Sequence, residues 1–120
     1  MGKTVVVLGA SPKIDRFSYK AVKSLVRHHH QVYAIGKRKG SVGDIPIHND
    51  QPHITGVDTV TMYLAPYHQG EIFDYVVSLR PKRVIFNPGT ESEELEEILE
   101  SYNIEVVHDC TLVMLATGRF

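Results

Sequence analysis

The chain has 120 residues, with 13 basic and 14 acidic side chains and a formal net charge of −1. This balance gives no electrostatic basis for binding nucleic acid or a membrane surface, and no apolar run approaches the ~20 residues that span a bilayer. The single cysteine excludes an intrachain disulfide, so we expect a reducing, cytoplasmic setting. The length and the 42% hydrophobic content fit one domain over residues 1–120.

The first predicted element is a strand. Residues 5–8 form a continuous apolar run, as expected of a strand that is buried on both faces. Further strands are predicted, in chain order, over residues 31–35, 59–64, 83–86 and, in a short form, 105–107. Between them, apolar residues recur at spacings of three and four, which predicts helices around residues 19–26, 72–79 and 95–102, with a last helical turn in 111–120.

Strands that alternate with helices indicate βαβ units. We therefore predict an α/β fold: a single Rossmann-like, doubly wound domain with a mostly parallel five-stranded sheet. Thr90 and Glu93 have the spacing of a capping box and predict the start of the third helix. The segment 37–57 is interpreted as irregular because of its glycines and prolines, with a minor strand around 45–47 as the alternative.

The loop after each of the first four strands is rich in small or polar residues. In doubly wound sheets, ligands bind beyond the carboxyl ends of the strands, so these loops are expected to share one binding edge. In the first loop, Gly9 permits a sharp turn, Ala10 leaves the backbone accessible and Ser11 offers a hydroxyl group for an anion. Only Gly9 matches the G-x-G-x-x-G fingerprint, which argues against NAD or FAD held in the usual manner.

The second loop is basic, with Lys37, Arg38 and Lys39 where a NAD-binding protein usually carries an acidic residue. This favours a ligand with a phosphate group on its ribose, either NADP or a 3′-phosphoadenosine. The alternative is a solvated basic loop without a ligand.

Several short motifs, in their order and spacing, are similar to a known family. They are Gly9-Ala10-Ser11-Pro12 with Ser18-Tyr19, the strand and basic loop at 32–39, Val57-Asp58, Ala65-Pro66, the loop 87–90 and the run 107–110. With them the chain resembles the YccU-like family of small stand-alone CoA-binding proteins and, more distantly, the CoA-binding domain of the succinyl-CoA synthetase α subunit. It departs from the family pattern at 63–66, where an arginine is often found, and at 86–88, where an aromatic residue and a glutamine are common.

The resemblance implies that the chain binds CoA or an acyl-CoA, without catalysis of its own. It implies a pyrophosphate over 9–11, a 3′-phosphate on Lys37 or Arg38 with Lys13 nearby, adenine near 64–66 and a pantetheine arm towards 87–89. The residues implied in binding are Gly9, Ala10, Ser11, Pro12, Lys13, Ser18, Tyr19, Gly36, Lys37, Arg38, Leu64, Ala65, Pro66, Asn87, Pro88 and Gly89. The alternatives are an NADP-type reductase or redox sensor, and an interaction module; a protein partner or a homo-oligomer is left open.

Other residue types with chemical potential are interpreted as structural. His28, His29 and His30 fall at a predicted helix end, where consecutive side chains point ~100° apart around the axis, so no metal site is predicted. Cys110 is interpreted as a small buried hydrophobe, with a mixed disulfide to the CoA thiol as the alternative. No catalytic residue is assigned, because no acid, base and nucleophile are placed together by the sequence.

Overall fold

A parallel sheet with helices on both faces forms the framework of the chain. The computed structural model describes residues 2–120. The elements, in chain order, are β1 (Thr4–Leu8), α1 (Phe17–Arg27), β2 (Gln31–Ile35), β3 (Gly40–Val42), β4 (Ile45–His48), β5 (Thr59–Met62), the 3₁₀ turns η1 (Pro66–His68) and η2 (Gly70–Ile72), α2 (Phe73–Leu79), β6 (Arg83–Phe86), α3 (Glu93–Ser101), β7 (Glu105–His108) and α4 (Thr111–Ala116).

The sheet has seven strands in the order β3-β4-β2-β1-β5-β6-β7, so the predicted number of five is wrong. The two additional strands lie in the segment interpreted as irregular: β4 corresponds to the minor strand around 45–47 that was given as the alternative, and β3 was not predicted. They form an antiparallel hairpin that turns at Gly43, whose φ is 58°. Pro46 is tolerated in β4 because only Ala34–Ile47 and Ile35–His48 are paired with β2. All other strand pairs are parallel.

The remaining elements follow the sequence pattern, with one exception at the start of α3. Ser92, and not Thr90, is the N-cap, because its hydroxyl group accepts a hydrogen bond from the Leu95 amide at 3.3 Å. The Glu96 carboxylate accepts from the Ser92 amide at 3.2 Å, one position later than the glutamate of a standard capping box. Thr90 is buried instead, where its hydroxyl group donates to the Asn87 carbonyl at 2.7 Å. The predicted cap at Thr90 is therefore wrong, and helix α3 begins at Glu93 after Ser92.

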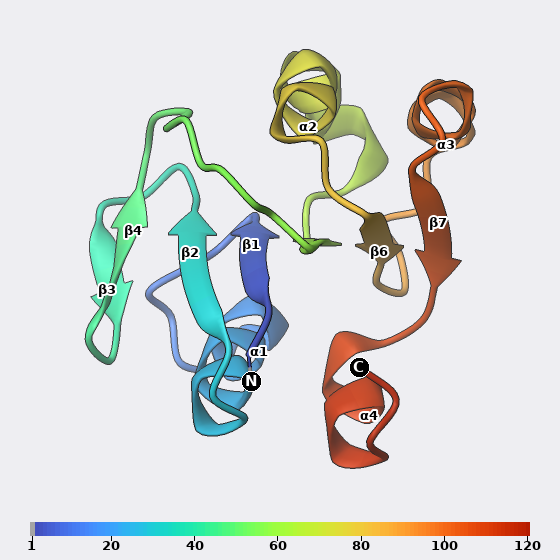
Figure 1. The fold of residues 1–120 in the computed structure, drawn as a ribbon. Helices are drawn as coiled ribbons and strands as arrows, with labels where there is room; N and C mark the ends of the chain where they lie inside the picture. Colours follow the sequence, from blue (N-terminus) through green and yellow to red (C-terminus); the bar gives the residue numbers. More distant parts are fainter. Residues whose placement is uncertain (1) are drawn as a thin grey trace.

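The helices cover the sheet in two layers (Figure 1). Helices α2 and α3 lie on one face, over a core that includes Val6, Val60 and Phe86. Helices α1 and α4 lie on the other face, over a core that includes Val5, Val7 and Leu25. The alternation of Val5, Val6 and Val7 between the two cores is the reason for the continuous apolar run in β1. Within residues 2–120, no helix has the length and apolar character needed to traverse a lipid bilayer.

The order of the strands reverses direction at β1. The chain first runs outward from β1 through β2 to β4 and β3, and then returns to place β5 on the other side of β1. The connections that leave β1 and β5 therefore part at the carboxyl edge of the sheet, where open α/β sheets form a crevice. The ligand-binding site predicted from the sequence lies at this carboxyl edge.

The loops after β1 and β2 are held against each other through their backbones. The amides of Gly9 and Ala10 both donate to the carbonyl of Ile35, each at 2.9 Å. A Cβ atom on Gly36 would overlap the carbonyl oxygen of Ala10. Glycine at position 36 is therefore required by this close approach of two backbones.

The substitution Gly36→Ala is expected to lower the free energy of unfolding by about 2 kcal/mol, because the new methyl group must push the Ala10 carbonyl away. Urea unfolding monitored by circular dichroism measures this loss. The matched control is Gly70→Ala, where a Cβ atom would meet no atom of residues 2–120 within 4 Å, leaving aside the chain neighbours. The control should change stability by less than about 0.5 kcal/mol. Equal effects of the two substitutions would contradict the close-approach explanation.

Candidate functional site

The carboxyl edge carries a cavity on the α2 side of the sheet. Its volume is about 170 Å³, and it opens between the ends of β1 and β2, the loop after β4 and the turns η1 and η2. We call it the α2-side cavity. Its lining residues are Leu8, Gly9, Ile35, Gly36, Lys37, Asn49, Asp50, Gln51, Leu64, His68, Glu71, Ile72 and Tyr75.

Four of the residues implied by the resemblance line the α2-side cavity: Gly9, Gly36, Lys37 and Leu64. The structure adds polar residues that the sequence analysis did not assign. They are Asn49, Asp50 and Gln51 from the loop after β4, and His68 and Glu71 from η1 and η2. Asn49, Asp50 and Gln51 could have been predicted with the rule applied to the other loops, because they are polar residues that follow a strand. That strand, at 45–47, was given only as the alternative. No comparable signal marks the short 3₁₀ turns.

The first loop offers fewer free amides than its sequence suggested. The amides of Gly9 and Ala10 are engaged with the Ile35 carbonyl, and the Ser11 hydroxyl accepts a hydrogen bond from the Lys13 amide at 3.2 Å. Helix α1 starts only at Phe17, and its N-cap residue, Arg16, makes no side-chain cap. The amides best placed for an anion are therefore those that open α1, where the helix dipole is also positive.

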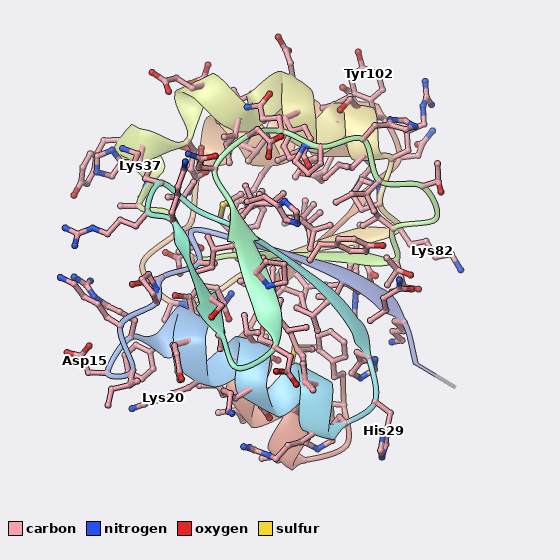
Figure 2. The ribbon with its side chains drawn as sticks, turned by 90° about the vertical axis from the view of Figure 1, so that its left-hand side faces the viewer. Asp15, Lys20, His29, Lys37, Lys82 and Tyr102 are labelled. Atoms are coloured by element: carbon pink, nitrogen blue, oxygen red, sulfur yellow. The ribbon has the colours of Figure 1, made fainter. Side chains whose placement is uncertain are left out.

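Cations at the two edges of the sheet differ in their surroundings. Figure 2 shows Lys37 at the carboxyl edge, on the same side as Asp15, and Lys82 at the amino edge. At the amino edge, Lys82 pairs with Asp58 at 3.8 Å, and Lys3 donates to the Phe120 carbonyl at 2.7 Å. The exposed cations near the carboxyl edge, namely Lys13, Arg16, Lys37, Arg38 and Lys39, take part in no ion pair within residues 2–120. This edge therefore has positive charge available for an anionic ligand.

A second cavity lies on the other face of the same edge. Its volume is also about 170 Å³, and we call it the α4-side cavity. It is lined by Phe17, Tyr63, Asn87, Pro88, Cys110 and Leu112, so none of its lining side chains carries a full charge at neutral pH. Asn87 and Pro88 are the two residues of the implied set that it contains. The consecutive residues Tyr63 and Leu64 line different cavities. The two cavities therefore lie on either side of the chain just after β5.

Asn87 holds this part of the edge together. It is buried, and its side-chain amide donates to the Thr61 hydroxyl at 2.7 Å and to the Met62 carbonyl at 2.8 Å. Its side-chain oxygen accepts from the Thr111 amide at 2.8 Å. Asn87 thus connects β5, β6 and the start of α4, so the structure gives this residue a structural role in addition to its place in the cavity wall.

Tyr63 has the most perturbed acid–base behaviour in the α4-side cavity. Its pKa is raised to about 12, first because burial takes the phenolate away from water and second because of Cys110. The hydroxyls of Thr111 and Thr61 oppose the rise, but the Tyr63 hydroxyl is buried and has no hydrogen-bond partner among residues 2–120. The threonine hydroxyls bond to each other at 2.8 Å instead. Tyr63 is therefore a buried phenol that stays protonated at neutral pH.

The other implied residues line neither cavity. Ala10 packs beneath Gly36, and Pro12 lies against Gly40, where a Cβ atom would come within 2.9 Å of the Pro12 ring. Ser18 is buried in α1, and Tyr19 packs on the core of that face. Pro66 begins η1, and the rest are in the loops of the edge: Ser11, Lys13, Arg38, Ala65 and Gly89. Within residues 2–120, no three His, Cys, Asp or Glu side chains are grouped so that they could hold a metal ion.

Comparison with known proteins gives one family and several related structures. The model of a family described as a CoA binding domain matches residues 3–116. A crystal structure of an uncharacterized protein is 50% identical, with a TM-score of 0.97, over 100% of this chain and 99% of that chain. No curated protein gives a significant match.

Two more distant structures share the fold. A hypothetical protein from Pyrococcus horikoshii OT3 is 19% identical, with a TM-score of 0.87, over 97% of this chain and 83% of that chain. The protein cell-free ID.343 from Thermus thermophilus is 22% identical, with a TM-score of 0.87, over 99% of this chain and 91% of that chain. At these identities the likeness concerns the fold alone.

The substitution Asn87→Leu keeps the side-chain volume and removes three hydrogen bonds. We expect the free energy of unfolding to fall by about 2–4 kcal/mol, because the Thr111 amide and the Met62 carbonyl are left buried without a partner. Urea unfolding measures the change. The control is Ser101→Ala at an exposed helix end, which should stay within about 0.5 kcal/mol. A loss as small as that of the control would show that Asn87 does not hold the edge.

The raised pKa of Tyr63 makes stability depend on alkaline pH. The folded protein holds the phenolic proton more tightly than the unfolded chain, so this stabilisation is complete below pH 10 and is lost as pH rises from 10.0 towards about 12. The free energy of unfolding of the wild type should therefore decrease more steeply over this range than that of Tyr63→Phe. Parallel pH profiles of the two proteins would contradict the assignment.

Proposed function

The chain belongs to the CoA binding domain family, and we propose that it binds coenzyme A or an acyl-CoA at the carboxyl edge of its sheet. The observation that carries this proposal is the family match over residues 3–116, together with cavities that open on both faces of that edge. The strand order, which reverses at β1, supports a Rossmann-like arrangement in which an elongated cofactor crosses the edge between β1 and β5.

The α2-side cavity is suited to the adenosine end of the cofactor. Leu8, Ile35 and Leu64 supply apolar walls for the faces of a base. Asn49 and Gln51 bring amide groups that can donate to ring nitrogens and accept from an exocyclic amino group. These residue types favour a planar, polar-edged ring over a purely apolar ligand.

The phosphate groups fit outside this cavity, at the cationic rim. Asp50 and Glu71 line the cavity and would repel a phosphate placed deep inside it. Lys37 stands in the wall of the same cavity and is exposed, with Arg38 and Lys39 next to it in the loop. We assign the 3′-phosphate to Lys37 and Arg38, and the pyrophosphate to Ser11, Lys13 and the opening turn of α1.

The pantetheine arm then runs over the loop that contains Pro88 and Gly89. This path takes it from the rim of the first cavity to the α4-side cavity, whose wall includes Pro88. Ala65 and Pro66, which follow Leu64 after the end of β5, would form the floor between the two ends of the cofactor.

The substitution Lys37→Ala should weaken CoA binding about ten-fold, because one charge-assisted contact to the 3′-phosphate is lost. Isothermal titration with CoA and with dephospho-CoA tests this. The wild type should prefer CoA, and the variant should bind the two ligands almost equally. The control is Arg27→Ala, which removes an exposed cation in the last turn of α1 and should leave the affinity unchanged.

Equal affinity of the wild type for CoA and dephospho-CoA would overturn the assignment of Lys37 and Arg38. Failure to bind either compound would overturn the proposed function itself. A parallel titration with NADPH examines the NADP-type alternative, for which NADPH should bind more tightly than CoA.

A further inference from the structure

The α4-side cavity has features that binding of CoA alone does not use. It shares no lining residue with the α2-side cavity, and none of its own lining residues is charged. We propose that this cavity receives the acyl group of a short, uncharged acyl-CoA, which makes an acyl thioester and not free CoA the preferred ligand. This inference rests on the proposed function, because it requires the carrier to cross the carboxyl edge.

The size of the α4-side cavity sets the length of the acyl group. A dry apolar cavity of about 150 Å³ is large enough to bind benzene, which has six carbon atoms. The cavity here has about 170 Å³ and therefore fits an acyl chain of about four to six carbon atoms. Longer chains would have to project past Phe17, which is 68% exposed at the mouth.

The chemistry of the walls sets the charge of the acyl group. Pro88, Leu112 and Phe17 present apolar surface, and the polar groups of Asn87 are engaged in hydrogen bonds with Thr61, Met62 and Thr111. A carboxylate inside this space would lose its water without gaining a cationic partner, which is strongly unfavourable. The cavity should therefore select against dicarboxylic acyl groups such as succinyl.

Tyr63 contributes to the wall of the cavity, but its hydroxyl group lies inside the protein. That hydroxyl group has almost no accessible surface and neighbours the hydroxyls of Thr111 and Thr61. A ligand in the cavity therefore does not reach it. The preference for acylated over free CoA depends on the apolar walls, which bury the hydrocarbon of the acyl group.

The test is a set of titrations of the wild type and Tyr63→Phe with CoA, butyryl-CoA, decanoyl-CoA and succinyl-CoA. For the wild type, butyryl-CoA should bind at least about ten-fold more tightly than CoA, since about 0.8 kcal/mol is gained for each buried methylene group. Decanoyl-CoA should gain nothing over butyryl-CoA, and succinyl-CoA should bind no better than CoA.

The Tyr63→Phe variant tests the hydroxyl group separately from the apolar walls of the cavity. Tyr63→Phe removes only a hydroxyl group that a ligand does not reach, so it should keep the wild-type affinity for both CoA and butyryl-CoA. Equal affinity of the wild type for CoA, butyryl-CoA and succinyl-CoA would overturn the acyl cavity and leave CoA binding intact. Absence of binding for all four ligands would overturn the proposed function instead.

Discussion

One carbonyl group that accepts two amides fixes the geometry of the carboxyl edge. The Ile35 carbonyl binds the amides of both Gly9 and Ala10, so the loop after β1 is fastened to the end of β2. The missing side chain of Gly36 allows the Ala10 carbonyl to pack directly against this junction. The α2-side cavity is lined by Gly9, Ile35 and Gly36, and so its shape depends on these backbone contacts. Rearranging them would alter the cavity before any ligand-binding side chain were changed.

The two faces of the carboxyl edge differ in chemistry although they are close in space. On one side, Asp50, Glu71 and Lys37 make a polar cavity with a cationic rim. On the other side, Leu112 and Pro88 contribute to a cavity without charge. An elongated carrier with a nucleotide at one end and a thioester at the other combines the same two chemistries. The arrangement supports a ligand that crosses the edge over a ligand that fills one cavity.

Much of the framework could be predicted from the sequence, because its signals are periodic. Buried strands such as β1 and helices with an apolar stripe such as α1 can be recognised from the spacing of apolar residues in a short window of sequence. The β3–β4 hairpin could not be assigned with the same rules, since Gly40, Gly43 and Pro46 are typical of loops and its pairing depends on β2. Thr90 is not the cap because its hydroxyl group donates to the Asn87 carbonyl in the preceding turn, while its own carbonyl accepts from the distant Gln69 side chain.

The candidate site was predicted only in part, for a related physical reason. Lys37 and Leu64 follow strands that the sequence reveals, and they line the α2-side cavity. Asn49 and Asp50 follow β4, which the sequence indicates only as an alternative to an irregular segment. The buried hydroxyl of Tyr63 is a property of three-dimensional packing and has no sequence signature.

Amide NMR spectra recorded during a titration with CoA locate the ligand, because each backbone amide reports on its own surroundings. If CoA binds at the carboxyl edge, the resonances of Ser11, Lys37, Asp50 and Gly89 shift first and saturate together. Shifts that gather instead at the amino edge, around the Phe120 ring that packs against Lys3 and Arg83, would exclude binding at the carboxyl edge. An unchanged spectrum at saturating CoA would exclude it as well.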